Sequence, residues 1–249
     1  MSLKVTIITV TYNAASTIEQ TIKSVLDQDY NIIEYIIIDG LSTDNTIQVA
    51  NKYKSRISKI VSEKDKGIYD AMNKGIRNAN GKYIGFCNSG DIIKINSLQT
   101  IVKFLKKDID VLFATVKRNY IGSTIIKSGY NLKRLSYNFD FATAHSTGFY
   151  IKKKFHNKIG LYDLSFKCSA DYDFYLRVFK EKNLKVMSTN PNKIIGEVQS
   201  GGFSSTYSAF DHIVEETKIR IRNNQNIFLI SLIFANALMK NFIKYLIKS

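Results

Sequence analysis

Short polar groups stand directly after apolar, strand-like runs in the first part of the chain. They are Thr11-Tyr12-Asn13, Asp39, Glu63 with Asp65, and Asn88-Ser89-Gly90-Asp91. Carboxylates in such places can accept a hydrogen bond from the ring N–H of a nucleotide base. With diphosphate oxygens and water they can also hold Mg²⁺ or Mn²⁺. Because ligands bind beyond the carboxyl ends of parallel strands, we expect these groups to meet at one edge of a sheet.

Two of these carboxylates each have two interpretations. Asp39 ends an isoleucine-rich run, and it either accepts the ring N–H of uracil (or thymine) or caps the next helix as a turn residue. Asp65 precedes a predicted helix, where it either contacts the ligand or is a charge that the helix dipole favours. Gly67 would let the backbone approach a ligand closely. Glu63 is expected to be a structural partner.

A further carboxylate lies at the start of a predicted helix in the second half of the chain. Asp171 opens this helix, so its side chain can project from the helix N-terminus as a general base. A base must reach the acceptor hydroxyl and stay ionised. Asp173 is the alternative, but a step of two residues along a helix points it to another face. The non-catalytic interpretation of Asp171 is a helix cap.

The elements that must position these residues alternate between strand and helix. Runs of β-branched residues predict strands at 5–10, 34–39, 57–61 and 83–87. Helical spacing predicts helices between them, the first opened by a capping box of Ser16 and Glu19. This order predicts an α/β fold with a mostly parallel sheet and right-handed crossovers.

The second half is less regular. The pattern predicts a hairpin of strands 111–120 and 124–127, a strand at 147–151 and a helix at 171–181. We expect one domain over 1–205 and a C-terminal helical extension over 206–249.

The extension combines a polar helix at 207–222 with an apolar helix at 227–248. The charge-free run 227–239 is too short to cross a bilayer, which takes about 20 residues. The alternatives are an interfacial helix at a membrane surface and a buried packing or dimer helix.

Composition indicates a soluble globular protein with an anionic partner. Apolar and aromatic residues make up 45% of the chain and charged residues 23%. The net charge of +15 fits nucleic acid, acidic lipid or a phosphorylated substrate, although a biased genome composition also explains lysine richness. Two distant cysteines, Cys87 and Cys168, and the lack of a signal-peptide pattern favour the cytoplasm.

Five stretches, in this order along the chain, resemble glycosyltransferase family 2. They are 5–13, 38–46, 62–75, 88–91 and 169–177, and the similarity is greatest to bacterial enzymes of surface-polysaccharide assembly. The resemblance implies a GT-A fold, a Rossmann-like central sheet flanked by helices.

The resemblance also implies roles for individual residues. Nucleotide-sugar contacts are implied for Thr11, Tyr12, Asn13, Asp39, Asp65, Gly67, Ser89 and Asp91. Asp91 matches the acid that ligates Mn²⁺ or Mg²⁺, with a plain turn as the alternative, while Gly90 replaces the first acid of the family motif. Asp171 matches the base. His145 lies where the family often has a histidine near the acceptor or diphosphate, and a loop histidine without a role is the alternative.

The resulting hypothesis is an inverting hexosyltransferase that uses a nucleotide-sugar, UDP-sugar first among them. Its acceptor is a glycan or polyprenyl-linked glycan, with peripheral contact of 227–249 at the inner face of the cytoplasmic membrane. Nucleic acid is not an expected partner because no RNA-binding aromatic motif is present, and the oligomeric state is left open. The alternatives are a nucleotidyltransferase with a related core and a non-catalytic nucleotide- or membrane-binding module.

Overall fold

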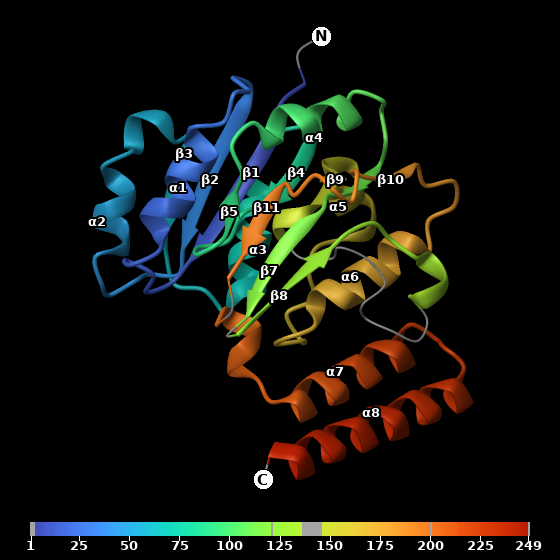
Figure 1. Ribbon diagram of the computed structural model, residues 1–249. Coiled ribbons are helices and arrows are strands. Elements are labelled where there is room, and N and C mark those ends of the chain that lie inside the picture. The colour runs from blue at the N-terminus through green and yellow to red at the C-terminus, as the bar shows by residue number, and fades with distance from the viewer. Residues whose placement is uncertain (1–2, 121, 136–145, 200, 249) are drawn as a thin grey trace.

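A mostly parallel sheet forms the centre of the molecule (Figure 1). The computed structural model describes residues 3–120, 122–135, 146–199 and 201–248. Within them the strand order is β10 (Val186–Ser188), β6 (Val111–Phe113), β9 (Phe149–Lys152), β4 (Tyr83–Phe86), β1 (Val5–Thr11), β2 (Ile33–Asp39), β3 (Lys59–Ser62). The strands β4, β1, β2 and β3 are parallel, and β9 runs antiparallel to both of its neighbours. The predicted α/β fold is confirmed.

Both faces of this sheet are covered, which explains why its strands are continuous apolar runs rather than alternating ones. Neighbouring residues of β1 point to opposite faces, so Ile7 belongs to one core and Ile8 to the other. The helices that surround the sheet are α1 (Ile18–Leu26), α2 (Thr46–Asn51), α3 (Ile68–Asn78), α4 (Ser97–Leu105), α5 (Lys153–Ile159) and α6 (Ala170–Phe179). The core that contains Ile8 holds residues of α3 and α6, and the other holds residues of α1 and α4.

Two local predictions were wrong. The first is the capping box of Ser16 and Glu19. The N-cap residue of α1 is Thr17, which makes no capping hydrogen bond with its side chain, and Glu19 instead accepts a hydrogen bond from Tyr53. The predicted strand 111–120 is divided between two sheets. It breaks at Ala114 and Thr115, whose backbone N–H groups donate to the Gly148 carbonyl and to the Thr189 hydroxyl.

The second, smaller sheet has the order β5 (Ile92–Ile93), β11 (Gly196–Val198), β7 (Val116–Tyr120), β8 (Ser123–Lys127). The strands β7 and β8 form the predicted hairpin. The strand β5 directly follows Asp91, so this sheet adjoins the carboxyl end of β4.

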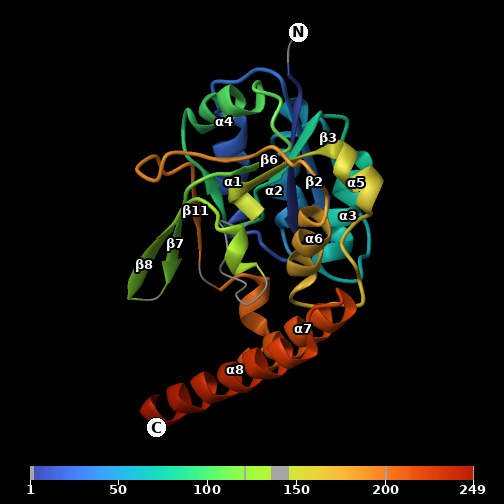
Figure 2. The same ribbon diagram turned by 90° about the vertical axis from the view of Figure 1, so that its right-hand side faces the viewer.

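The C-terminal extension is a pair of helices, α7 (Ala209–Arg222) and α8 (Ile227–Lys248). Both views place α8 on the outer side of α7, away from the sheet (Figures 1 and 2). A capping box of Ser208 and Asp211 starts α7. Across the described residues, none of the helices has the length and apolar character of a membrane span.

Candidate functional site

The polar residues that follow β1, β2, β3 and β4 lie at one edge of the central sheet. In the parallel register Thr11 stands beside Asp39, and Asp39 stands beside Ser62. Beyond β4, the backbone N–H of Ser89 donates to the carbonyl of Val10 at 3.2 Å, next to Thr11. The tertiary structure therefore brings together residues that are far apart in the chain.

Three loops touch at Gly40, directly after β2. A Cβ atom at this position would overlap the Asp65 carboxylate and would lie 3.3 Å from the Tyr12 ring. Tyr12 is 62% exposed, so this residue is largely open to solvent. Asp65 in turn accepts a hydrogen bond of 2.9 Å from the backbone N–H of Gly67. The loops after β1, β2 and β3 thus form one surface.

Gly67 caps the N-terminus of α3 with a φ of +111°. Residues with a side chain rarely adopt this backbone conformation, which explains why a glycine occupies the position. Apart from its own neighbours in the chain, no atom lies within 4 Å of the place where its Cβ would be, so there is open space beside Gly67. A helix N-terminus with an open front suits an anionic group.

The contacts of Asp39 match the turn alternative. Its carboxylate is fully buried, and it accepts hydrogen bonds from the Ser42 backbone N–H (3.0 Å), the Ser62 hydroxyl (2.7 Å) and the Ser42 hydroxyl. A nucleotide contact at Asp39 stays a prediction. Asn13 is also used within the chain, because its side-chain oxygen accepts from the Thr43 backbone N–H at 2.9 Å.

Thr11 offers an unused polar atom at the same edge. Its Oγ1 is buried and has no hydrogen-bond partner among the described residues. A buried hydroxyl without a partner costs about 1–3 kcal/mol of stability. Such an atom is expected where a ligand completes the hydrogen bonding.

Asp91 is buried at the end of the β4 loop, with an exposed fraction of 5%. Its Oδ2 accepts a hydrogen bond of 2.8 Å from the Thr147 hydroxyl. Burial raises the pKa of Asp91 to about 7, although Thr147, the Gln199 backbone N–H and the charge of Arg118 act in the opposite direction. Gly90, which replaces the expected first acid, has a φ of +95°, so this loop conformation itself favours glycine.

These residues fit a divalent cation only if a bound nucleotide-sugar and water supply most of the ligands of the metal. Among the described residues no group of three or more His, Cys, Asp or Glu side chains could hold a metal. Mg²⁺ commonly uses one or two carboxylates together with substrate phosphates and water. Asp91, oriented by Thr147, can supply such a carboxylate.

Asp171 lies in the first turn of α6, which packs in the same core as α3. Its Oδ1 accepts hydrogen bonds from the Tyr69 hydroxyl (3.1 Å) and from the Tyr172 backbone N–H (2.9 Å). Tyr69 is two residues from Gly67. Burial raises the pKa of Asp171 to about 6, opposed by these two hydrogen bonds and by the charge of His212. A carboxylate with this pKa is a competent base near neutral pH.

The alternative carboxylate, Asp173, has a structural role. It pairs with Arg177 at 2.8 Å and accepts a hydrogen bond from Asn223 at 3.2 Å. Glu63 also behaves as the structural partner that was expected, since it pairs with Lys74 at 3.0 Å. His145 lies outside the described residues.

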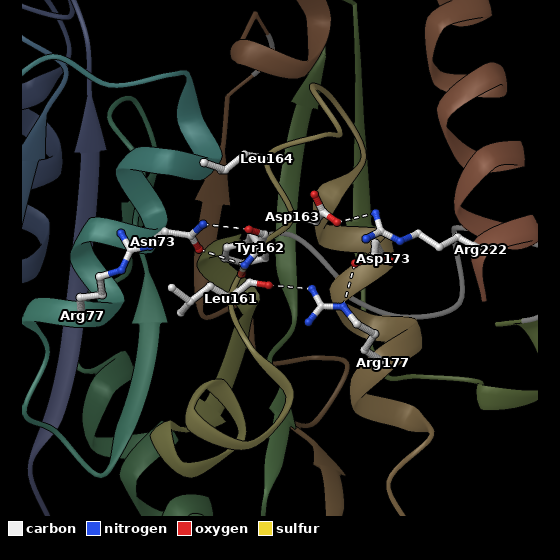
Figure 3. A pocket seen from close by; sticks show the side chains of 9 residues that line it. All are labelled: Asn73, Arg77, Leu161, Tyr162, Asp163, Leu164, Asp173, Arg177 and Arg222. Carbon is white, nitrogen blue, oxygen red and sulfur yellow. Dashed lines mark hydrogen bonds and ion pairs between the residues drawn. The ribbon is translucent and has the colours of Figure 1, made fainter.

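A cavity of about 360 Å³ lies beside α6, but its polar groups are largely used within the protein (Figure 3). Arg177 binds Asp173 and two backbone carbonyls, Arg222 pairs with Asp163, and the Asn73 side chain bonds the Tyr162 backbone. This leaves few groups that could recognise a nucleotide-sugar, so we do not assign the donor to this cavity.

Sequence reasoning missed two residues of the site, Tyr69 and Thr147. Tyr69 resembles any aromatic residue on a helix face, and Thr147 resembles any β-branched residue at a strand end. Their roles come from partners 102 and 56 positions away. No local spacing signals such a pairing.

The architecture is that of the GT-A fold. The chain aligns with the Staphylococcus aureus TarS fragment 1–349 in complex with UDP-GlcNAc at a TM-score of 0.72 and 21% identity, covering 95% of this chain and 72% of that one. It also aligns with a Pyrobaculum calidifontis mannosyltransferase, PcManGT, in complex with GDP-Man and Mn²⁺, at a TM-score of 0.66 and 16% identity over 94% and 69%. At these identities the similarity shows the fold alone.

Residues 6–170 match the sequence profile of glycosyl transferase family 2, and the chain belongs to this family. It is 29% identical over 186 residues to a PGL/p-HBAD biosynthesis glycosyltransferase of Mycobacterium bovis, covering 72% of this chain and 70% of the relative. It is 27% identical over 248 residues, 97% and 96% of the two chains, to the Escherichia coli UDP-Glc:alpha-D-GlcNAc-diphosphoundecaprenol beta-1,3-glucosyltransferase WfaP. The resemblance inferred from the motifs is confirmed.

Proposed function

We propose that this glycosyltransferase moves a hexose from a UDP-sugar to a glycan carried on a polyprenyl diphosphate, with inversion, in bacterial surface-polysaccharide assembly. The observation that carries the proposal is the hydrogen bond from Tyr69 to Asp171, which ties a carboxylate of raised pKa to a residue in the first turn of α3. The similarity to WfaP over nearly the whole chain supports the choice of donor and acceptor.

The donor binds across the carboxyl edge of the sheet. The exposed Tyr12 ring offers a stacking surface, and the Thr11 hydroxyl offers a buried polar atom without a partner in the described structure. Asn13, Asp39 and Asp65 shape the adjacent loops. Gly67 and Ser89 lie where the diphosphate and sugar would enter.

Asp91 would hold Mn²⁺ or Mg²⁺ together with the donor diphosphate. Such an ion supplies Lewis-acid stabilisation of the charge on a departing diphosphate. The Thr147 hydroxyl fixes one oxygen of Asp91 and so directs the carboxylate.

Asp171 acts as the base. It takes the proton from the acceptor hydroxyl as the acceptor oxygen forms a bond to the anomeric carbon. The bond from that carbon to the diphosphate oxygen breaks in the same displacement, and UDP leaves with the electron pair. Because the attack is in line, the anomeric configuration inverts.

Helix α8 would bring the enzyme to its lipid-linked acceptor at the inner face of the cytoplasmic membrane. Large apolar side chains along this helix are exposed, and they are Ile227, Phe228, Leu232, Met239, Phe242, Ile243 and Leu246. With a net charge of +15, such a helix suits an anionic lipid surface. A dimer contact through the same face is the alternative outcome of the test given below.

The proposal is tested first by thermal shift with UDP, GDP, UDP-glucose, UDP-GlcNAc and GDP-mannose, each with and without Mn²⁺. A ligand that binds only the native state raises the melting temperature. We expect UDP and a UDP-sugar to give the largest rise, and a rise with GDP compounds alone would overturn the choice of donor.

The second test measures transfer from that UDP-sugar to a lipid-diphosphate-linked α-GlcNAc. The expected products are UDP and the inverted glycoside, and Asp171→Asn should lower kcat by about 10²- to 10⁴-fold. Release of pyrophosphate would indicate a nucleotidyltransferase instead. Equal rates for wild type and Asp171→Asn would remove the assignment of the base.

A further inference from the structure

Helix α7 lies outside the segment that the family profile matches, yet it reaches the start of α6. The Glu215 carboxylate accepts backbone hydrogen bonds from Lys167 (2.6 Å), Cys168 (2.8 Å) and Ser169 (3.0 Å). These residues directly precede α6, which begins at Ala170. One carboxylate from the C-terminal extension thus holds the entry to the helix that carries Asp171.

This carboxylate holds the residues that lead into α6 and does not cap the helix itself. Ser169 is the N-cap residue of α6, but its side chain makes no capping hydrogen bond. Glu215 instead binds the N–H groups of Ser169 and of the two residues before it, at the helix end where the dipole favours an anion. Burial raises the pKa of Glu215, but the hydrogen bonds from 167–169 outweigh it, so its pKa lies below the ordinary value. Glu215 is therefore an anion at neutral pH.

The neighbours of Glu215 on α7 also interact electrostatically with the base. The charge of His212 lowers the pKa of Asp171, and Asp171 in turn is one of the groups that raise the pKa of Glu216, after burial. On its other side Asp171 is held by the Tyr69 hydroxyl. The base is therefore hydrogen-bonded to α3 and lies within electrostatic range of α7.

We propose that Glu215 is a positioning residue for Asp171, so that α7 is a working part of the transferase site. The inference rests on the proposed role of Asp171 as the base. The backbone at 167–169 sets the direction of the first turn of α6, and Asp171 reaches the acceptor from that turn. A misplacement of about 1 Å can lower a rate by about 100-fold.

The test substitutes Glu215→Gln, which keeps the size but removes the charge, and Glu215→Asp, which keeps the charge but shortens the reach. The substrates are UDP-glucose or UDP-GlcNAc, whichever raises the melting temperature more, and a lipid-diphosphate-linked α-GlcNAc. Rates are expressed per UDP-binding site, so that unfolded protein does not count. We expect kcat to fall about 10-fold or more in both variants, with the donor KM changed less than about 2-fold.

The matched control is Glu181→Gln near the other end of α6, where the carboxylate pairs with Lys158. It should leave kcat unchanged. An unchanged kcat in Glu215→Gln and Glu215→Asp would overturn the proposal.

A double-mutant cycle separates positioning from general stabilisation. If Glu215 acts through the base, Glu215→Gln has no further effect on kcat in the Asp171→Asn background. Additive losses would overturn the proposal, because Glu215 would then act independently of Asp171. If Asp171→Asn alone leaves kcat intact, the base assignment fails. If Asp171→Asn lowers kcat and Glu215→Gln does not, only the positioning role fails.

Discussion

The hydroxyl of Thr147 donates a hydrogen bond of 2.8 Å to Oδ2 of Asp91, across 56 positions of the chain. Thr147 stands just before β9, the antiparallel strand next to β4. The turn that leads into β9 therefore orients the carboxylate that follows β4. This relationship is the basis of the first prediction.

Thr147→Val should weaken metal dependence without removing it. Valine keeps the methyl group that lies close to Gly196 but loses the hydroxyl that orients Asp91. We expect a several-fold higher Mn²⁺ concentration for half of the UDP-dependent rise in melting temperature. Asp91→Asn should abolish the Mn²⁺ effect. Asp108→Asn, at an exposed acid that pairs with Lys82, is the control and should behave as wild type. An unchanged Mn²⁺ effect in Asp91→Asn would refute the metal assignment.

The rate of transfer should depend on pH through Asp171. Only the ionised carboxylate is a base, and burial raises its pKa to about 6. The rate should therefore rise with pH and level off above about 7, and at pH 5 it should be about 10-fold below the plateau. The measurement is kcat/KM for UDP release between pH 4.5 and 8. Repeating it at higher Mn²⁺ separates Asp91, whose protonation competes with metal binding, from Asp171. A profile that stays flat down to pH 5 would contradict this role.

Gly67→Ala should destabilise the protein and weaken UDP binding. Because no atom lies near the new Cβ, the cost comes from the backbone at φ +111° rather than from a clash. An alanine at such a position costs more than about 1 kcal/mol. The matched control is Gly202→Ala, where the space is equally open but φ is −66°. We expect a lower melting temperature for Gly67→Ala and little change for Gly202→Ala, and equal effects would show that the backbone conformation is not the cause.

Removal of residues 227–249 should abolish binding to anionic vesicles and leave the thermal shift with UDP intact. Phe228→Ser tests the same point within the full chain, because this side chain is 71% exposed and its loss removes apolar surface without opening the core. Ile230→Ser, at a buried position of the same helix, should instead lower the melting temperature. If vesicle binding survives both the truncation and Phe228→Ser, α8 serves packing or dimerisation instead. A dimer that becomes a monomer on truncation would show dimerisation.

The sequence by itself determined the central parallel strands and the places where their polar residues emerge. Runs such as Val5–Thr11 are β-branched throughout, and a strand of this kind is stable only when both faces are buried. For these reasons the α/β fold and the shared edge could be predicted before any contact was known.

Only the tertiary structure decided which side chains act on these carboxylates. Tyr69 reaches Asp171, Thr147 reaches Asp91, and Glu215 reaches the start of α6, each across 46 or more positions. It also revealed that Asp39 is surrounded by serine donors. Periodicity and turn chemistry describe neighbours along the chain, whereas these hydrogen bonds depend on how helices pack against the sheet, which no short window of sequence encodes.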